Sequence, residues 1–181
     1  DIPKSTLVVA TFPMALVHAG WGEWDEAQQI IEQCLTLSNE IGDWKRWREV
    51  IGLSGDINHF LGHYEAAIKD YTAAYNSTER VQNFSQMAIQ LAIRARSLFY
   101  IGHYDAARKA AEKALSFDDA QMVKLNSIPV YVLDDLRLSQ WDELGTQLAL
   151  LDTHIANNRL KLYVQLDGYS ASAEAHLALL A

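Results

Sequence analysis

Small and apolar residues recur at intervals of three and four positions along most of the chain. The clearest series follows Tyr64 and comprises Ala67, Ile68, Tyr71, Ala74 and Tyr75. Residues at this spacing lie on one face of an α-helix, which can pack against a neighbour. Residues 24–35 and 104–115 repeat the pattern, and apolar-rich stretches such as 51–61 and 87–101 lie between them. The sequence lacks strand-like alternation with hairpin turn signals, so it predicts an all-α protein.

Four copies of one short phrase separate these helical segments. The first three copies have a glycine, an aromatic residue two positions later, then one or two acidic residues and an alanine. The phrase is defined by Gly22, Trp24, Ala27, Gly62, Tyr64, Ala67, Gly102, Tyr104, Ala107 and Trp141. The aromatic residues are 40, 40 and 37 positions apart, and the fourth copy has Ser139 and Leu144 in place of glycine and alanine. Internal similarity at a period of this length is typical of repeat proteins.

Each position of the phrase has a physical explanation. Glycine ends a first helix, because a left-handed residue commonly closes helices and glycine adopts that conformation most easily. The aromatic residue starts a second helix and packs back on the first, and acidic residues in the first turn interact favourably with the helix dipole. Alanine lets the two helices approach closely. The repeated unit is therefore a helical hairpin, which needs a neighbouring hairpin to bury its apolar face.

The phrase resembles the tetratricopeptide repeat, which has further small residues on both helices. The earlier small-residue site, seven positions before the closing residue, is filled by Ala15, Gly55, Ala95 and Val132, and the later site by Cys34, Ala74, Ala114 and Leu151. The match covers almost the whole chain, although the period is near 40 rather than about 34 and no proline follows the second helix. The resemblance implies a right-handed α-solenoid of antiparallel helical hairpins.

Long repeats that begin with a segment such as Ile41–Trp44 are also similar to the helical arrays of large bacterial regulators. Those regulators include STAND-type transcription activators and ATPase-linked nucleotide cyclases or kinases. This narrower resemblance implies an interaction or regulatory scaffold within a larger signalling or transcription-regulating protein. The partner that it implies is a peptide, another protein or an adjoining domain of the same chain.

We expect one array over residues 1–181. Its hairpins are expected at residues 5–41, 44–80, 84–118 and 127–158, followed by an unpaired helix at 161–181. Ser127 can cap a helix that has Pro129 in its first turn, which sets the start of the fourth hairpin. Pro13 follows Thr11, so the first helix is expected to begin or kink there. The half repeat at the end and the missing initiator methionine predict a fragment of a longer protein.

The charge balance narrows the range of partners. The chain has 15 Lys and Arg residues against 23 Asp and Glu residues, a formal net charge of −8. Nucleic acids and anionic membranes are bound mainly through clustered basic residues, and no run of Lys or Arg exceeds a pair, so neither partner is expected. Residues 5–22 lack charged side chains, but Pro13 and His18 interrupt them, which favours a buried helix over a membrane span. The single cysteine, Cys34, cannot form an internal disulfide, which favours a reducing, cytoplasmic location.

No residue pattern predicts catalysis or a cofactor. His59 and His63 are four positions apart, as metal ligands can be, but Gly62 ends the helix between them, so a turn histidine and a groove histidine are expected instead. Cys34 occupies a small-residue position of the core and is interpreted as an inert buried thiol. The glycines form no phosphate-binding motif. We therefore expect a protein that is not an enzyme and binds no cofactor or metal.

Three further features have two interpretations each. Trp44 and Trp47 flank a pair of basic residues and could stack on a partner, although packing between hairpins is the commoner use of aromatic residues. The basic residues of segment 108–113 could meet an acidic partner or form a solvated face. The acidic pairs 118–119 and 134–135 could bind cations, or act as caps and solvated groups.

The main candidate site is the concave groove that the first helices of such an array line. The repeat register assigns to it Glu49, Asp56, His59, Phe60, Arg96, Phe99, Tyr100, Asn126, Leu133 and Arg137. This mixture of aromatic, basic and acidic groups is typical of a peptide-binding surface. Two alternatives stay open. One is a small-molecule inducer in a polar pocket of Asp56, His59 and Arg96, and the other is packing against neighbouring hairpins or domains.

Overall fold

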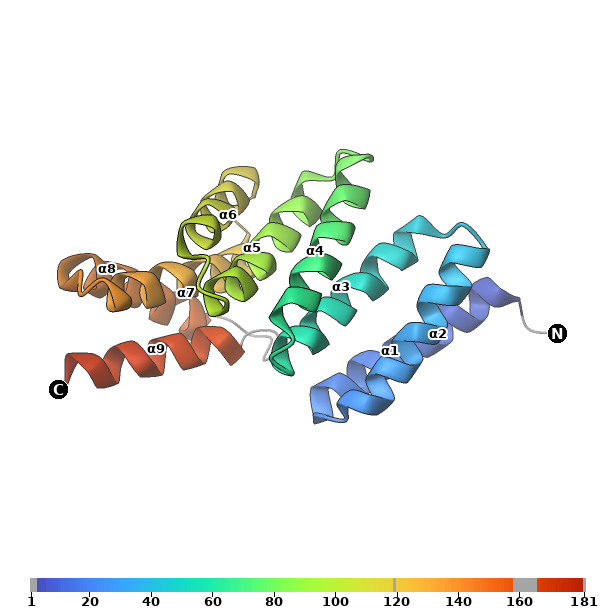
Figure 1. Cartoon of the computed structure of the whole chain (residues 1–181), viewed down its shortest axis with the longest axis horizontal. Coiled ribbons are helices and arrows are strands. Elements are labelled where there is room, and N and C mark those ends of the chain that lie inside the picture. The colour runs from blue at the N-terminus through green and yellow to red at the C-terminus, as the bar shows by residue number, and fades with distance from the viewer. Residues whose placement is uncertain (1–2, 119, 158–165, 181) are drawn as a thin grey trace. The chain divides into compact units, whose positions relative to one another are not determined.

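The computed structural model of the chain describes residues 3–118, 120–157 and 166–180 (Figure 1). Nearly all of these residues are helical, and these ranges contain no strand. The helices are, in chain order, α1 (Lys4–Trp21), α2 (Trp24–Glu40), α3 (Trp44–Phe60), α4 (Tyr64–Glu79), α5 (Phe84–Tyr100), α6 (Tyr104–Phe117), α7 (Gln121–Arg137), α8 (Trp141–Asn157) and α9 (Leu166–Leu179). The prediction of an all-α helical-repeat fold of the α-solenoid class is confirmed.

The predicted glycines close the first helix of three hairpins. Gly22, Gly62 and Gly102 have φ angles of 79°, 78° and 81°, in the left-handed region. The backbone N–H that follows each glycine donates to a carbonyl of the preceding helix at 2.8–2.9 Å. Ser139 takes the same place in the fourth copy with a φ of 57°, and the next N–H donates to the Asp135 carbonyl at 2.9 Å. The degenerate copy therefore keeps the turn without a glycine.

Fully buried residues at the start of each second helix bring the two helices of a hairpin together. Ala27, Ala67 and Ala107 are all inaccessible to solvent, as the repeat predicts. Leu144 takes this position in α8 and is also fully buried. It belongs to a core cluster that α7, α8 and α9 share. The position that alanine occupies in the other three hairpins is thus filled by a larger side chain in the fourth.

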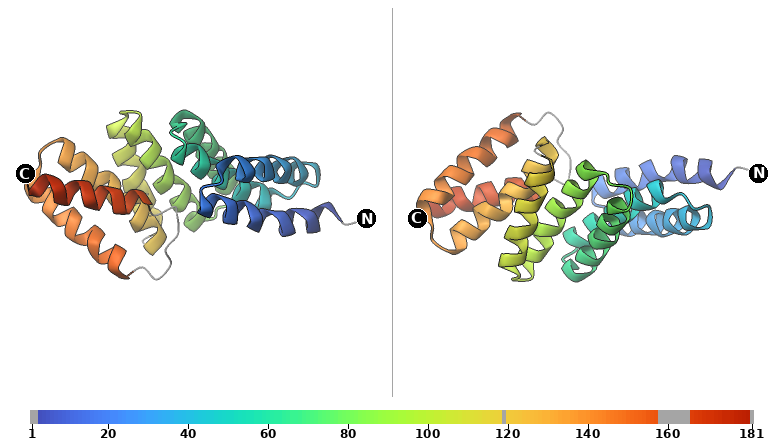
Figure 2. Two further views of the ribbon diagram at one scale, coloured as in Figure 1. Left: turned by 90° about the horizontal axis from the view of Figure 1, so that it is seen from below. Right: turned by 90° about the horizontal axis from the view of Figure 1, so that it is seen from above.

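The helices form two compact units (Figure 2). Unit 1 comprises residues 1–82, with the hairpins α1–α2 and α3–α4, and α2 packs against α3. Unit 2 comprises residues 83–181, with the hairpins α5–α6 and α7–α8. In unit 2, α7 packs against α5 and α6, and α9 packs against α7 and α8. Each unit therefore stacks its helices as a repeat array does, while the single array over residues 1–181 stays a prediction.

The start of α7 differs from the expectation. The helix begins at Gln121 rather than at residue 127, so Pro129 lies in its interior and Ser127 is a buried helical residue instead of a cap. Proline removes one helical N–H donor at such a position. Burial of Val123 and Leu125, which are 0% and 2% exposed, stabilises the additional turns and offsets that loss.

The first and last helices also bear on the expected boundaries. The first helix, α1, begins at Lys4 and contains Pro13 in its interior, so this proline does not start the helix. Val8, which precedes the proline, is fully buried, so the first turns of α1 contribute to the core. Part of the predicted final helix is observed as α9, and residues 161–165 and 181 of that range lie outside the described residues.

Candidate binding surfaces

Helix α3 carries the four residues that the repeat register assigns to a groove in unit 1, and two of them are buried. Asp56 is 9% exposed and accepts a 2.8 Å hydrogen bond from the Tyr71 hydroxyl of α4. His59 is 3% exposed, and its ring centroid lies 5.3 Å from those of Phe60 and Tyr64. Asp56 and His59 therefore hold α3 against α4 and offer little surface to a partner.

The other two residues of this set, Glu49 and Phe60, keep accessible surface. Glu49 is ion-paired with Arg46 one helical turn earlier. Phe60 stacks on Trp24, the repeat aromatic residue of α2, with ring centroids 5.9 Å apart and an interplanar angle of 20°. The register thus predicts which residues lie on one side of α3, but not which of them are accessible.

In unit 2 the structure brings four of the predicted residues together. One cleft is lined by Arg96, Phe99 and Tyr100 of α5 and by Leu133 of α7, together with Asp167 of α9. The cleft measures about 10 Å³, which is about the space of one water molecule. Arg96 is 2% exposed, and its Nη1 lies 2.8 Å from Asp167 Oδ2. The arginine that was expected to face a ligand is therefore paired with α9, a contact that no signal in the sequence predicts.

The predicted residues Phe99, Tyr100 and Arg137 join Tyr104 in a connected group that we call the aromatic rim of unit 2. The Phe99 ring lies edge to face with Tyr100 at 6.1 Å and with Tyr104 at 5.0 Å between centroids. The Arg137 guanidinium lies 4.0 Å from the centroid of the Tyr104 ring and also pairs with Asp134 at 2.8 Å. Tyr100 is 40% exposed, and Tyr104 and Arg137 line a shallow pocket of about 450 Å³. The rim therefore presents aromatic rings and one cation that other side chains hold in place.

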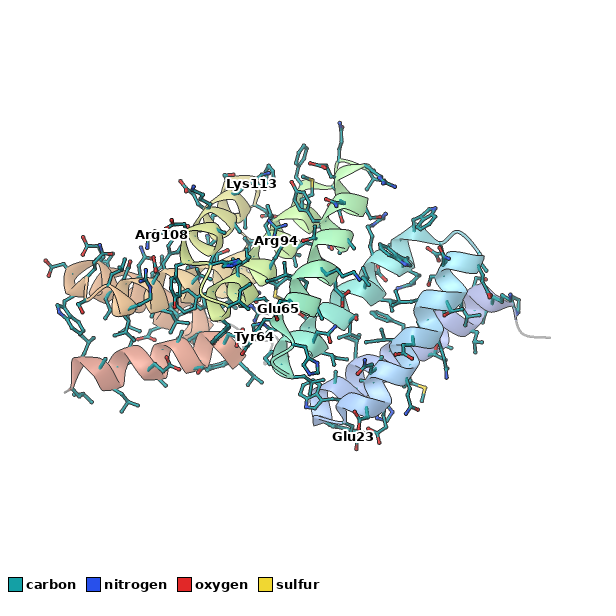
Figure 3. All side chains as sticks on the ribbon, in the orientation of Figure 1. Glu23, Tyr64, Glu65, Arg94, Arg108 and Lys113 are labelled. Atoms are coloured by element: carbon teal, nitrogen blue, oxygen red, sulfur yellow. The ribbon has the colours of Figure 1, made fainter. Side chains whose placement is uncertain are left out.

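Asn126 and the acidic pair of α7 lie inside unit 2. Asn126 is 1% exposed, and its Nδ2 donates to a backbone carbonyl of the preceding helical turn at 2.7 Å. Arg108 projects from α6 (Figure 3). Its Nη1 donates hydrogen bonds to Asp134 and Asp135 at 2.9 and 3.0 Å. Burial opposes the charge of Arg108, but these hydrogen bonds outweigh it and raise the pKa of the guanidinium. The cation that this acidic pair binds is thus the protein's own arginine.

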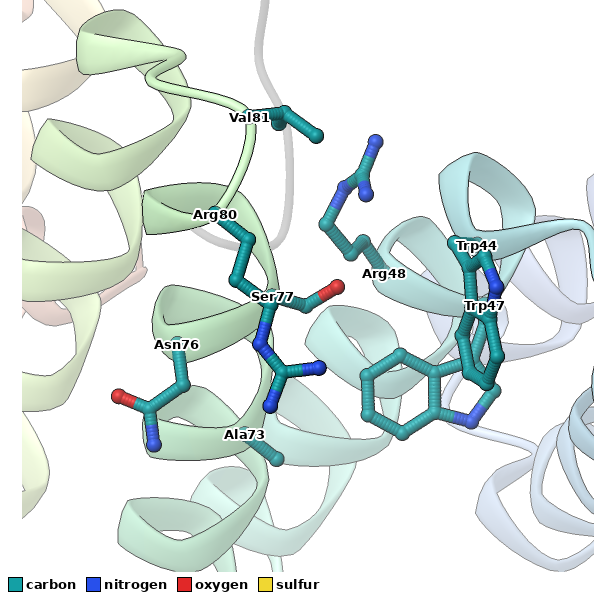
Figure 4. A pocket seen from close by; sticks show the side chains of 8 residues that line it. All are labelled: Trp44, Trp47, Arg48, Ala73, Asn76, Ser77, Arg80 and Val81. Carbon is teal, nitrogen blue, oxygen red and sulfur yellow. The ribbon is translucent and has the colours of Figure 1, made fainter.

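A second accessible site lies between α3 and α4, and we call it the tryptophan cavity of unit 1 (Figure 4). It measures about 450 Å³ and is lined by Trp44, Trp47, Arg48, Ala73, Asn76, Ser77, Arg80 and Val81. The two indoles lie edge to face with centroids 6.1 Å apart. Trp44 is 53% exposed, so this tryptophan pair forms a wall of a cavity that is open to solvent.

Sequence reasoning missed the two arginines of the tryptophan cavity. Neither Arg48 nor Arg80 makes an ion pair or hydrogen bond within the described residues. Arg48 could have been found, because it lies one helical turn after Trp44 on the same face of α3. Arg80 directly follows the last residue of α4, and no local pattern associates it with the indoles.

Three remaining expectations concern Cys34, metal binding and membrane insertion. Cys34 is fully buried with its Sγ 3.2 Å from Thr11 Oγ1, as the repeat register predicts. Within the described ranges, no three His, Cys, Asp or Glu side chains are grouped as metal ligands. No helix in that part of the chain has the length and apolar character that a bilayer-spanning segment needs.

Comparison with known proteins identifies one repeat. Residues 49–79 match the family model described as tetratricopeptide repeat. The matched segment begins within α3, crosses the turn at Gly62 and ends at the last residue of α4. No curated protein matches the chain in sequence. The protein is therefore an array of helical repeats whose second hairpin contains a recognisable tetratricopeptide repeat.

Proposed function

We propose that the protein is an interaction module that binds a peptide or an adjoining domain through the exposed faces of its hairpins. Tetratricopeptide repeats generally mediate protein–protein interactions, so the match at residues 49–79 supports this proposal. The surface that we propose for this binding is the aromatic rim of unit 2. Tyr100 is accessible there. Phe99 contacts the rings of both Tyr100 and Tyr104, and the Arg137 guanidinium lies over the Tyr104 ring.

The rim has the composition and the rigidity of a binding surface. Tyrosine and arginine are enriched among the residues that contribute most to interface energies. The contacts of Phe99 with Tyr100 and Tyr104 restrict the rings before binding, so little side-chain entropy is lost on association. A guanidinium has five N–H donors, so Arg137 can keep Asp134 and still donate to a carboxylate or carbonyl of a partner.

We further propose that this module acts within a larger regulator of signalling or transcription rather than as an enzyme. The resemblance of its long repeats to the arrays of bacterial regulators supports this finer assignment. The net charge of −8 favours a protein partner over nucleic acid or an anionic membrane. A cytoplasmic location, with its reducing conditions, suits the single buried cysteine.

The small-molecule alternative has less support. It requires Asp56, His59 and Arg96 to form one polar pocket. Asp56 and His59 are buried and pack α3 against α4. Arg96 is also buried and pairs with Asp167. We therefore restrict the proposal to protein partners.

Affinity capture with rim variants tests the proposed function. The full chain is used as bait in a lysate of its source cells, and bound proteins are quantified for the wild type, Tyr100→Ala and Arg137→Glu. We expect both variants to lose the same partners, whose direct binding is then confirmed by calorimetry with purified protein. Lys109→Glu changes the charge equally at an exposed position of α6 outside the rim and should retain them. Full recovery by both rim variants would move the binding surface elsewhere.

A further inference from the structure

The tryptophan cavity of unit 1 is built from a single helical hairpin and the two residues that follow it. Trp44, Trp47 and Arg48 of α3 form one wall. The other wall is formed by Ala73, Asn76 and Ser77 of α4, with Arg80 and Val81 just beyond the helix end. Its volume of about 450 Å³ falls in the range of roughly 300–1,000 Å³ that is typical of ligand sites. Among the described residues, all those that line the cavity belong to unit 1.

The indole pair gives the cavity an apolar wall. Trp44 and Trp47 meet at an interplanar angle of 71°, an arrangement in which each ring stabilises the position of the other. About half of the Trp44 surface is nevertheless exposed. An apolar group that entered the cavity would remove this ring surface from water, which is the main source of favourable free energy in such contacts.

Two arginines lie beside the indoles without carboxylate partners. Arg48 and Arg80 make no ion pair within the described part of the chain, whereas Arg46, two positions before Arg48, is paired with Glu49. This is notable in a chain with 23 acidic and 15 basic residues, where carboxylates are plentiful. Guanidinium groups recognise carboxylates through directed, charge-assisted hydrogen bonds. The two arginines are therefore suited to carboxylates that another molecule supplies.

The two guanidinium groups are directed to different parts of the cavity (Figure 4). The Arg80 side chain reaches from the C-terminal end of α4 toward the indoles, whereas the Arg48 guanidinium lies at the end near Val81. A ligand with a single carboxylate would satisfy one arginine and leave the other unpaired. Carboxylates on different residues of a peptide are separated and can reach both positions.

We propose that the tryptophan cavity binds an acidic peptide segment in which an apolar side chain is flanked by carboxylates. The apolar side chain lies against the indoles, and the carboxylates bind Arg48 and Arg80. Ser77 supplies a hydroxyl to the peptide backbone. The cavity shares no residue with the aromatic rim of unit 2, so the two proposals are tested by separate variants and fail separately.

Titration of the full chain with the blocked peptide Gly-Asp-Phe-Asp-Gly tests this proposal. Binding is measured by calorimetry and by ¹⁹F NMR of protein that contains 5-fluorotryptophan, whose five signals are assigned with single Trp→Phe variants. We expect saturable binding that shifts the signals of Trp44 and Trp47 and leaves the other three unchanged. Arg48→Gln and Arg80→Gln should each weaken binding about three- to tenfold. Lys109→Gln, at an exposed position of unit 2, is the matched control and should bind normally.

Three further titrations identify the chemistry that is recognised. Replacing both Asp residues of the peptide by Asn, or its Phe by Ala, should weaken binding about tenfold. Free phenylacetate has one ring and one carboxylate, and we expect it to bind more weakly than the peptide. Phenylacetate that binds as tightly as the peptide would overturn the proposal in favour of a small-molecule site. Equal binding of the Asn peptide, unshifted Trp44 and Trp47 signals, or no binding at millimolar peptide would also overturn it.

Discussion

The ring of Tyr71 occupies the space that a side chain at Gly55 would need. A Cβ at position 55 would lie 2.5 Å from Tyr71 Cε1 and 2.7 Å from its Cδ1. Tyr71 is fully buried, and its hydroxyl donates to Asp56 at 2.8 Å. Packing and this hydrogen bond therefore fix the position of the ring. The close approach of α3 and α4 thus explains why the small-residue position of the second repeat is a glycine.

Gly55→Ala is expected to lower the free energy of unfolding by about 1–3 kcal/mol, because the added methyl group overpacks this contact. This loss should appear although alanine favours a helix over glycine by about 1 kcal/mol. Gly145 of α8 has no atom within 4 Å of an added Cβ, so Gly145→Ala is the matched control and should stabilise the protein. Urea unfolding followed by circular dichroism measures both changes. Equal effects of the two substitutions would contradict the steric explanation.

Ser139 adopts a left-handed conformation that costs about 1 kcal/mol for a residue with a side chain. Ser139→Gly should therefore raise the midpoint of thermal unfolding. The reverse exchange, Gly102→Ser, places a side chain at a φ of 81° and should lower it. Differential scanning calorimetry measures both, and shifts of the same sign would show that backbone strain is not the cause.

The closing turns and the small-residue positions could be predicted because they depend on neighbours within one hairpin. A glycine that ends a helix and an alanine five positions later act over a few residues, and the phrase occurs in four copies. The repetition also identifies Ser139 as a closing residue, because Ser139 occupies the position at which the other three copies have a glycine. Local chemistry and periodicity together were therefore sufficient for the helical hairpins.

The accessible surfaces could not be predicted in the same way, because burial and pairing depend on helices that are distant in sequence. Asp167 neutralises Arg96 across unit 2, and no local pattern connects them. Pro129 favours a helix start when α7 is considered alone, but core burial extends the helix past it. Pro129 has no N–H to donate to the Leu125 carbonyl one helical turn earlier. Gly168 of α9 packs close to this same carbonyl, since an added Cβ at Gly168 would lie 3.6 Å from its oxygen.

The buried ion pair between Arg96 and Asp167 should hold α9 on unit 2. Asp167→Asn removes the carboxylate charge opposite an almost inaccessible guanidinium, so we expect a loss of about 3 kcal/mol and faster amide hydrogen exchange in α9. Arg96→Met combined with Asp167→Leu removes both charges and should recover most of the loss.

The exposed pair of Lys4 and Glu40, whose atoms are 2.7 Å apart, provides the comparison for this prediction. Lys4→Ala should cost less than about 1 kcal/mol, because solvent screens an exposed ion pair. If Asp167→Asn costs no more than Lys4→Ala, or if exchange in α9 is unchanged, the pair does not fasten the helix.

The stability of unit 2 should depend on the protonation of His154. Its Nδ1 lies 2.9 Å from Gln121 Oε1, and Gln121 Nε2 donates to the His154 carbonyl at 2.7 Å, which connects α8 to α7. Burial, and then the charge of Lys124, lower the pKa of His154 below its ordinary value of 6.5. The unfolded chain therefore binds this proton more readily than the folded chain. The resulting stability is fully present above pH 6.5 and is lost as the pH falls toward the lowered pKa of the folded state.

His154→Gln removes this titration, so its free energy of unfolding should fall less steeply than that of the wild type between about pH 7 and pH 5. Urea unfolding at half-unit pH intervals measures the slope. His103→Gln, in the exposed turn before α6, removes one histidine outside this contact and is the matched control. If the free energy of unfolding has the same pH slope in the two variants, the environment of His154 is not the source of the pH dependence.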